Sequence, residues 1–189
     1  MGVRVIALDL STVSGAAFDG PRDGAPLFAT CTGVKRTGDV FGPTYVQFRD
    51  WLVDLIVVHR PTHLVFEAPW APTGARAPSR YTNVDVVMVL FGLAGIAEEV
   101  GARHLGAEAV WKVSVQTVRK HFLGHGRPEN PKAAVQHLCR LLGFHVKNEH
   151  EADACAIWSY GKSMLDKSFN GRDLPLVGVA ERRIAATGP

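Results

Sequence analysis

The chain opens with strand-like segments before any helical pattern, and this most restricts its fold. The run Val3–Leu8 is apolar and β-branched and ends at Asp9. Two more segments, at residues 16–18 and 28–34, follow after polar and Gly/Pro-containing turns. Short apolar segments joined by such turns predict an antiparallel meander of three strands. The chain is therefore expected to build its sheet from adjacent antiparallel strands first.

Helical spacing and further apolar runs then alternate along the chain. Apolar residues at helical spacing predict helices, and a short apolar run ending at Glu67 predicts a buried strand. The expected order is helix 44–60, strand 63–67, helix 84–100 closed by Gly101, weak strand 103–109, and helices 113–122, 131–142 and 151–165. This order predicts an α/β fold with a mixed sheet, three antiparallel strands followed by parallel strands, and helices on both faces.

Length and composition indicate one compact domain. The chain has 189 residues, of which 47% are hydrophobic and 21% charged, which is unlike a disordered segment. Its three Cys include no CxxC pair, so neither a disulfide framework nor a cysteine-based zinc site is expected. No signal peptide or membrane-length apolar run is evident, and a cytoplasmic location is predicted. The expected division is a domain at residues 1–165 and a C-terminal tail at 166–189.

Two acidic residues stand at the ends of predicted strands. Asp9 ends the first strand and Glu67 the fourth. If these strands are parallel neighbours, their ends lie at the edge where α/β sheets bind ligands. A metal ion or another cation would then compensate the cost of bringing both carboxylates out of water. Helix capping or turn formation is the alternative for each acid taken alone.

The last predicted helix brings another pair of polar side chains. His150 and Asp153 are three residues apart and share one helix face, whereas Glu151 points about 100° away. The first pair suits two ligands of one site. Glu149 and Glu151 are interpreted as acids that complement the positive end of the helix dipole.

These motifs resemble one nuclease family when they are taken in order. The segments Leu8–Ser11 through Gly15, Val65–Glu67 and His150–Ala156 are similar to those of the RuvC family of Holliday junction resolvases, within the RNase H-like superfamily. The resemblance spans about residues 3–164. Leu10-Ser11 replaces the usual Pro-Gly step, which points to a divergent, phage-type member. The resemblance implies an RNase H-like mixed sheet and a crossover junction endodeoxyribonuclease.

The resemblance also implies a metal centre. Its ligands would be Asp9, Glu67, His150 and Asp153, holding two Mg²⁺ ions for phosphodiester hydrolysis. Mn²⁺ is expected to substitute, since imidazole admits it more readily than Mg²⁺. His150 would bind one ion or assist proton transfer. Lys132 resembles the family's basic catalytic residue near the scissile phosphate.

DNA contacts are expected around this centre. Trp70 would stack on bases at the branch point, with packing on a helix as its alternative. Six Lys and Arg stand against one Glu between residues 119 and 147, a local charge of +5 within a chain of formal charge +3. The residues expected to contact backbone phosphates are Arg76, Arg80, Lys112, Arg119 and Lys120.

The expected partners are branched DNA, above all four-way junctions, and a second copy of the chain. Helix 84–100 is apolar on more than one face, so one face is predicted to pack on the sheet and another in a homodimer. Three other functions stay open. They are a flap or RNA–DNA hybrid nuclease, a protein that binds branched DNA without cutting it, and an ATP-using enzyme of the actin-like branch. The last lacks the glycine-rich phosphate loops it would need.

Overall fold

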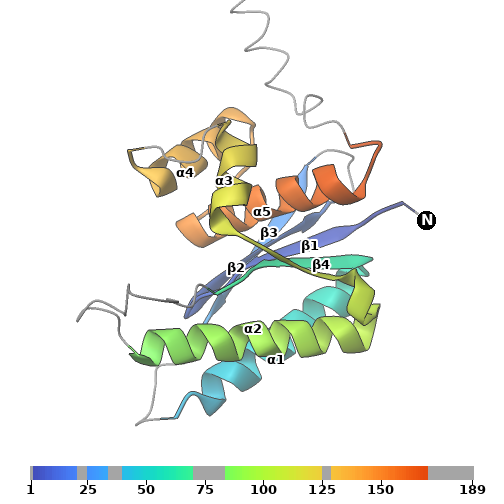
Figure 1. Cartoon of the computed structure of the whole chain (residues 1–189), viewed down its shortest axis with the longest axis vertical. Helices are drawn as coiled ribbons and strands as arrows, with labels where there is room; N and C mark the ends of the chain where they lie inside the picture. Colours follow the sequence, from blue (N-terminus) through green and yellow to red (C-terminus); the bar gives the residue numbers. More distant parts are fainter. Residues whose placement is uncertain (1, 21–24, 34–39, 70–83, 125–128, 170–189) are drawn as a thin grey trace, which may run out of the picture.

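The protein folds around one five-stranded sheet. The computed structural model describes residues 2–20, 25–33, 40–69, 84–124 and 129–169. Its strands, in the spatial order β3-β2-β1-β4-β5, are β1 (Val5–Asp9), β2 (Val13–Asp19), β3 (Pro26–Thr32), β4 (His63–Glu67) and β5 (Val110–Val113). Its helices are α1 (Gly42–His59), α2 (Val84–Leu105), η1 (Ala107–Ala109), α3 (Val115–Leu123), α4 (Pro131–Leu141) and α5 (Glu149–Leu165) (Figure 1).

The strand pairing places three carboxyl ends at one edge. β1 pairs antiparallel with β2, and β2 with β3, which confirms the predicted meander. β4 lies parallel to β1 with Leu8 opposite Phe66, and β5 lies parallel to β4 with Glu67 opposite Val113. Both acids at the ends of β1 and β4 therefore reach the same edge of the sheet. The expected mixed α/β fold is confirmed.

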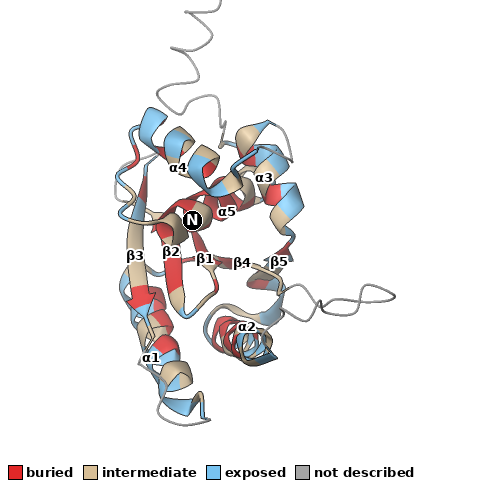
Figure 2. Cartoon of the chain, turned by 90° about the vertical axis from the view of Figure 1, so that its left-hand side faces the viewer, coloured by how far each residue is buried: buried red, intermediate tan, exposed pale blue. Residues whose placement is uncertain are grey.

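Helices cover both faces of the sheet, as predicted. α5, flanked by α3 and α4, lies on one face, and α1 and α2 lie on the other (Figures 1 and 2). Alternate residues of β1 divide between the two cores, since successive strand side chains point to opposite faces. Val5 and Ala7 pack toward α5, whereas Ile6 and Leu8 pack toward α1 and α2.

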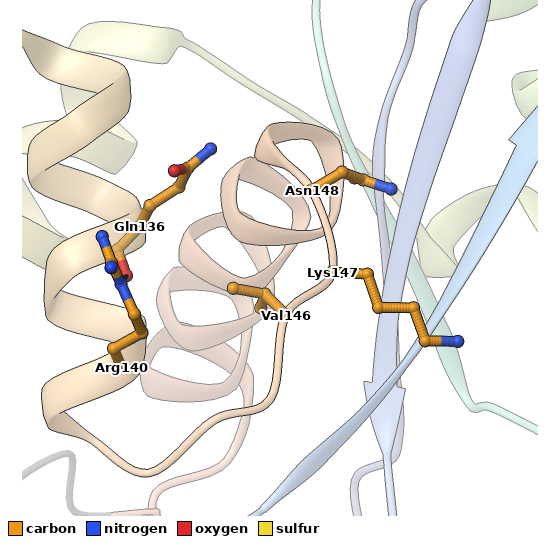
Figure 3. A pocket seen from close by; sticks show the side chains of 5 residues that line it. All are labelled: Gln136, Arg140, Val146, Lys147 and Asn148. Carbon is orange, nitrogen blue, oxygen red and sulfur yellow. Dashed lines mark hydrogen bonds between the residues drawn. The ribbon is translucent and has the colours of Figure 1, made fainter.

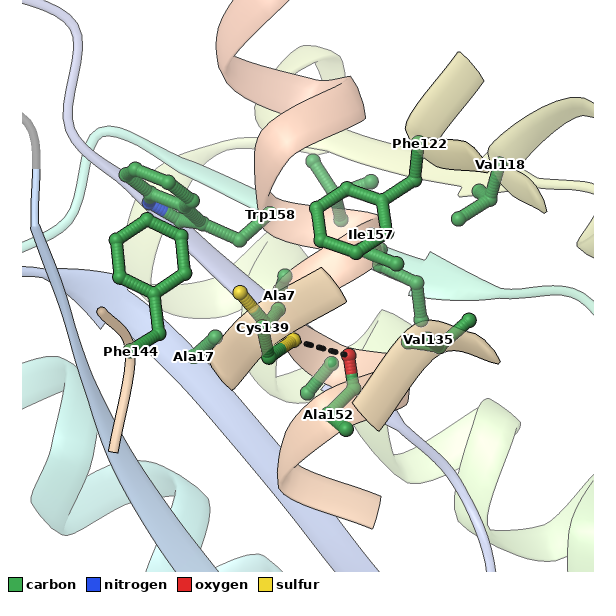
Figure 4. Packing of buried hydrophobic residues seen from close by; sticks show 14 of the residues in the cluster. Ala7, Ala17, Val118, Phe122, Val135, Cys139, Phe144, Ala152, Ile157 and Trp158 are labelled. Atoms are coloured by element: carbon green, nitrogen blue, oxygen red, sulfur yellow. Dashed lines mark hydrogen bonds between the residues drawn. The ribbon is translucent and has the colours of Figure 1, made fainter. Parts of the chain in front are cut away.

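α5 lies close to the sheet because its inward positions are small. Its buried residues include Ala152, Ala156 and Gly161, and a methyl group built on Gly161 would lie 3.0 Å from Val65 Cγ2. Larger side chains seal the outer part of this core, where Trp158 meets Phe144 edge to face (Figure 4). A helix packed this tightly holds its first turn at a fixed height above the ends of β1 and β4.

The region after residue 100 differs from the sequence prediction. Gly101 is not a C-cap, because α2 continues to Leu105. The glycine instead allows close packing, since a methyl group on it would lie 2.7 Å from both Leu64 and Val110. Residues 103–109 form no strand: they complete α2 and the short helix η1, and β5 begins at Val110. The helical periodicity could not show whether Gly101 ends the helix or allows another element to pack closely, because that depends on the neighbouring strands β4 and β5.

Three further features bear on the expectations. Among the described residues, no helix is long and apolar enough to span a bilayer. Cys31, Cys139 and Cys155 are free and buried. At the start of the expected tail, Phe169 packs edge to face on Trp158, with ring centroids 5.6 Å apart. Residues 170–189 lie outside the described part of the chain.

Candidate active site

The structure brings four of the predicted site residues to one edge of the sheet. Asp9 ends β1 and Glu67 ends β4, on neighbouring parallel strands. His150 and Asp153 reach the same edge from the first turns of α5. Asn148 fixes where that helix begins, since its Oδ1 accepts a hydrogen bond from the Glu151 amide at 2.9 Å.

His150 is bonded directly to Asp9. Its Nδ1 lies 2.8 Å from Asp9 Oδ2 and 3.3 Å from Ser11 Oγ. The hydrogen bond and the charge of Asp9 raise the pKa of His150, although burial opposes them. Both side chains are largely sheltered, with 20% of His150 and 15% of Asp9 exposed. The pair thus joins the end of β1 to the start of α5.

The other two acids carry strongly perturbed pKa values. Burial, and then the charges of Asp9 and Asp153, raise the pKa of Glu67 to about 7. Burial, and then the charge of Asp9, raise the pKa of Asp153 to about 6. Raised values of this kind mean that the ionised carboxylates repel one another in a poorly solvated site. A bound cation would relieve this repulsion. Strongly shifted pKa values of this kind are frequent at functional sites.

Two cationic side chains stand close to the acids. The charge of Arg119, on α3, lowers the pKa values of both Glu67 and Asp153 and so partly offsets the repulsion. Lys132, in the first turn of α4, forms an ion pair with Glu149 at 2.9 Å. Its charge also lowers the pKa of Asp153. Both cations thus contribute positive charge close to the acids.

The remaining predicted DNA contacts are placed differently. Lys112, on β5, forms an ion pair with Glu98 of α2 at 2.7 Å, so its ammonium group is already partnered. Lys120 is exposed on α3. Trp70, Arg76 and Arg80 lie outside the described residues.

The donor set fits a divalent cation in its chemistry. Three carboxylates and one imidazole are ligands that Mg²⁺ or Mn²⁺ accept, and the mutual repulsion of the acids is what a bound cation would relieve. Within the described part of the chain, however, no group of three or more such side chains is already arranged around one point. Asp9 is engaged by His150 instead. Metal binding would therefore require the Asp9–His150 pair to rearrange.

Sequence reasoning missed two features of this site. Arg119 was assigned to phosphate contacts in general, whereas its charge also lowers the pKa values of Glu67 and Asp153. Glu151 was interpreted as a complement to the helix dipole, but only 1% of it is exposed and its carboxylate accepts hydrogen bonds from Thr30 and from the Lys147 amide. The position of Glu151 on the helix indicated that its side chain points away from those of His150 and Asp153. Nothing in the local sequence indicated that Thr30 lies on that side.

A pocket of about 220 Å³ adjoins the start of α5 on its other side. The residues that line it come from α4 and from the segment before α5, and they are Gln136, Arg140, Val146, Lys147 and Asn148 (Figure 3). None of the four acid-site residues lines it. The lining of this pocket is therefore distinct from the acidic edge.

Comparisons with known proteins bear on the fold. No protein-family model matches the sequence, and no curated protein matches it. Among solved structures, the chain is similar to Thermus thermophilus RuvC in complex with a Holliday junction substrate, with a TM-score of 0.60 and 18% identity over 87% of this chain and 98% of that one. A structure of T. thermophilus RuvC gives a TM-score of 0.57 and 16% identity over 86% and 96% of the two chains.

A lower similarity is found to the yeast mitochondrial Holliday junction resolvase Ydc2. Its TM-score is 0.47, with 11% identity over 82% of this chain and 76% of that one. The two RuvC structures, matched over nearly their whole length, share the sheet and helix arrangement described above. The chain therefore has the RuvC-type, RNase H-like α/β fold.

Proposed function

We propose that this protein is a divalent-metal-dependent, structure-selective DNA endonuclease that hydrolyses phosphodiester bonds in Holliday junctions. The observation that carries this proposal is the convergence of Asp9, Glu67 and Asp153 from two strands and one helix. Acids so close together, with pKa values raised by burial and repulsion, are costly to the fold. A cation-dependent reaction accounts for keeping them.

Asp9, Glu67, His150 and Asp153 would hold the metal ions. Asp9 would be central to this ligand set, because its charge acts on both Glu67 and Asp153. Bound Mg²⁺ or Mn²⁺ would supply Lewis-acid stabilisation of the charge on the reacting phosphate and would make water a stronger nucleophile. His150, already bonded to Asp9, would bind through an imidazole nitrogen or carry a proton after its Nδ1 releases the carboxylate.

Lys132 and Arg119 would bind the substrate phosphate. Each stands beside the acids, and each could place a positive charge on a phosphate oxygen as negative charge develops. Lys132 would exchange its ion pair with Glu149 for one with the phosphate. The planar guanidinium of Arg119 suits two phosphate oxygens at once. Their positions favour cleavage chemistry over simple binding of DNA.

Four-way junctions are the proposed substrate. The fold is that of RuvC, one of whose structures holds a Holliday junction substrate. The basic segment 119–147 follows the edge strand β5 and includes the second half of α3 and all of α4, and both helices lie on the α5 face (Figure 1). Positive charge in this position favours a polyanionic substrate.

We further propose that a second copy of the chain packs on α2. Four apolar residues on this helix are between 45% and 67% exposed: Val84, Val86, Met88 and Phe91. Gly95, one turn after Phe91, has open space beside it, which would allow close approach of a partner helix. Gly92 instead packs on Tyr45 of α1 within the chain. A two-fold dimer would match a two-fold junction and place one active site on each of two strands.

The test of this function is a cleavage panel. Labelled four-way junction, linear duplex, flap and RNA–DNA hybrid are incubated with the protein in Mg²⁺ and in Mn²⁺. Paired nicks across the junction, with intact duplex, are expected. Preferred cutting of flaps or hybrids would replace the proposed substrate with that of another nuclease of the superfamily. Tight junction binding with no cleavage in either metal would contradict the enzymatic proposal.

A further inference from the structure

Glu151 is a buried carboxylate next to the candidate ligands, but it faces away from them. Only 1% of it is exposed, although it stands between His150 and Asp153 in sequence. Its side chain extends toward β3, the far edge strand of the sheet, rather than toward β1 and β4. A buried carboxylate is costly unless its oxygens are hydrogen-bonded. Its partners therefore indicate what keeps it there.

Hydrogen bonds satisfy both carboxylate oxygens of Glu151. Thr30 on β3 donates its hydroxyl to Oε1 at 2.8 Å, and the backbone amide of Lys147 donates to Oε2 at 2.7 Å. The side chain of Asn148 closes the ring, since its Nδ2 donates to Thr30 Oγ1 at 2.9 Å while its Oδ1 caps Glu151. The three side chains thus tie the segment before α5, the first turn of α5 and β3 together.

A second contact holds the same turn from β2. A methyl group built on Gly15 would lie 2.2 Å from the carbonyl oxygen of His150, so β2 and the backbone of α5 approach too closely for any side chain. Gly15 is opposite Asp9 in the sheet register. The first turn of α5 is therefore fixed from β2 directly below the acidic edge and from β3 through Glu151.

We propose that Glu151 is a positioning residue that locks the first turn of α5 so that His150 and Asp153 face Asp9 and Glu67. The inference rests on the proposed function, because it treats those four residues as metal ligands. A turn pinned by the ring of Glu151, Thr30 and Asn148 holds the backbone of both ligands in place, so that only their side chains have to adjust when a metal binds. Partners that orient ligands in this way affect metal affinity by about 10- to 100-fold in known sites.

The test uses Thr30→Val, which removes the hydroxyl without changing the shape of the side chain or touching the acidic edge. Thr32→Val is the matched control, since Thr32 lies two residues along the same strand and is exposed. Three properties are measured for each variant and for the wild type. They are the Mn²⁺ concentration that gives half of the metal-induced rise in Tm, the Mn²⁺ concentration for half-maximal junction cleavage, and amide hydrogen exchange along α5.

Thr30→Val is expected to raise both Mn²⁺ midpoints by about 10-fold, with cleavage restored at saturating metal. Amides of residues 150–152 should exchange faster, whereas those near Trp158 should keep their protection. Glu151→Gln, which keeps one acceptor and the size of the side chain, should give a smaller shift in the same direction. Thr32→Val should match the wild type.

Two results would overturn the role of Glu151. One is an unchanged Mn²⁺ midpoint in Thr30→Val, and the other is unchanged exchange at residues 150–152. A lower Tm of Thr30→Val with unchanged Mn²⁺ midpoints would mean that Glu151 stabilises the fold but does not position the ligands. If Mn²⁺ fails to stabilise even the wild type, the metal site of the proposed function is wrong. Hydrogen exchange would then still decide whether Glu151 holds the turn.

Discussion

At the scale of single residues, the half-buried carboxylates of the acidic edge lower the free energy of unfolding when they are ionised. Burial, and then the charge of Asp9, raise the pKa of Glu67 to about 7 and that of Asp153 to about 6. A carboxyl whose folded-state pKa is raised destabilises the fold when it ionises. The loss begins above the unfolded pKa and is complete above the folded pKa, which for Glu67 is the interval from about pH 4.5 to 7.

Glu67→Gln should therefore stabilise the metal-free protein while abolishing cleavage. In EDTA at pH 8 we expect a gain of about 1–3 kcal/mol in unfolding free energy, discounted from the full shift for partial solvation. The gain should vanish near pH 4.5. Urea denaturation across this range measures it.

Glu99→Gln is the matched control for this prediction. Hydrogen bonds with Arg103 lower the pKa of Glu99, so the same change there should bring no gain at pH 8. A Glu67→Gln variant that is less stable than the wild type in EDTA would contradict the account of repulsion at this edge.

The imidazole of His150 gives a prediction about metal preference. His150→Asp replaces the softer nitrogen ligand with an oxygen ligand, and oxygen suits Mg²⁺. We expect the ratio of cleavage rates in Mg²⁺ and Mn²⁺ to rise by about 10-fold or more relative to the wild type. Junction cleavage under single-turnover conditions in each metal measures the ratio. An unchanged ratio would remove His150 from the ligand set.

Local sequence patterns predicted part of this site, whereas the rest depends on contacts between residues far apart in the sequence. Asp9 and Glu67 were readable because each ends an apolar run, and His150 and Asp153 because of their helical spacing. The structure brings these four residues together, while their roles remain predictions. Glu151 was not readable, because its partner Thr30 lies 121 residues away in sequence. Arg119 could be recognised as basic, but its place among the acids depends on how α3 packs.

At the scale of elements, α2 shows how packing overrides a local signal. The glycine at position 101 resembled a helix end, yet the helix runs one more turn to Leu105. The close approach of β4 and β5 explains the glycine, since both strands contact the same spot on α2. Such contacts depend on the order of the strands in the sheet. The sequence pattern predicted a mixed sheet but not which strands pack against α2. The expected strand at residues 103–109 was wrong for the same reason.

Two identical substitutions in α2 test this interpretation. Gly101→Ala places a methyl group 2.7 Å from Leu64 and Val110 in the core, and overpacking of this kind should cost about 1–3 kcal/mol despite the better helix propensity of Ala. Gly95→Ala meets open space within the chain, so in a monomeric Phe91→Asp background it should gain about 0.5–1 kcal/mol. Urea denaturation of both variants at equal protein concentration compares them. Equal effects of the two changes would argue against close packing at position 101.

At the scale of the whole molecule, the sheet separates two different surfaces. One face carries α5, α3 and α4 with the acidic edge, and the other carries α1 and α2 with exposed apolar side chains (Figure 2). This separation would let two copies join through α2 without covering either active site. The fold class and the helices on both faces followed from the order of sequence patterns. The proposed dimer rests on the exposure of apolar side chains on α2, which only the structure shows.

Phe91→Asp should prevent dimer formation and uncouple the two nicks. Phe91 is 45% exposed, so the change should leave the monomer folded while placing a charge in the proposed interface. Analytical ultracentrifugation should show a monomer, and a junction in a supercoiled plasmid should give nicked circles in place of linear products.

Val58→Asp on α1 is the control for this substitution, since Val58 is 70% exposed on a different helix. It should remain dimeric and keep paired cleavage. A wild-type protein that sediments as a monomer at micromolar concentration would contradict the arrangement.

If the acidic edge cleaves DNA, Asp9→Asn should abolish cleavage and leave junction binding intact. The variant and the wild type are compared for single-turnover cleavage of a labelled four-way junction in Mg²⁺ and Mn²⁺, and for binding to the same junction in Ca²⁺. We expect Asp9→Asn to lower the rate of cleavage at least about 1,000-fold and to change the affinity for the junction no more than about two-fold. Cleavage by Asp9→Asn at the wild-type rate would contradict this role of the acidic edge.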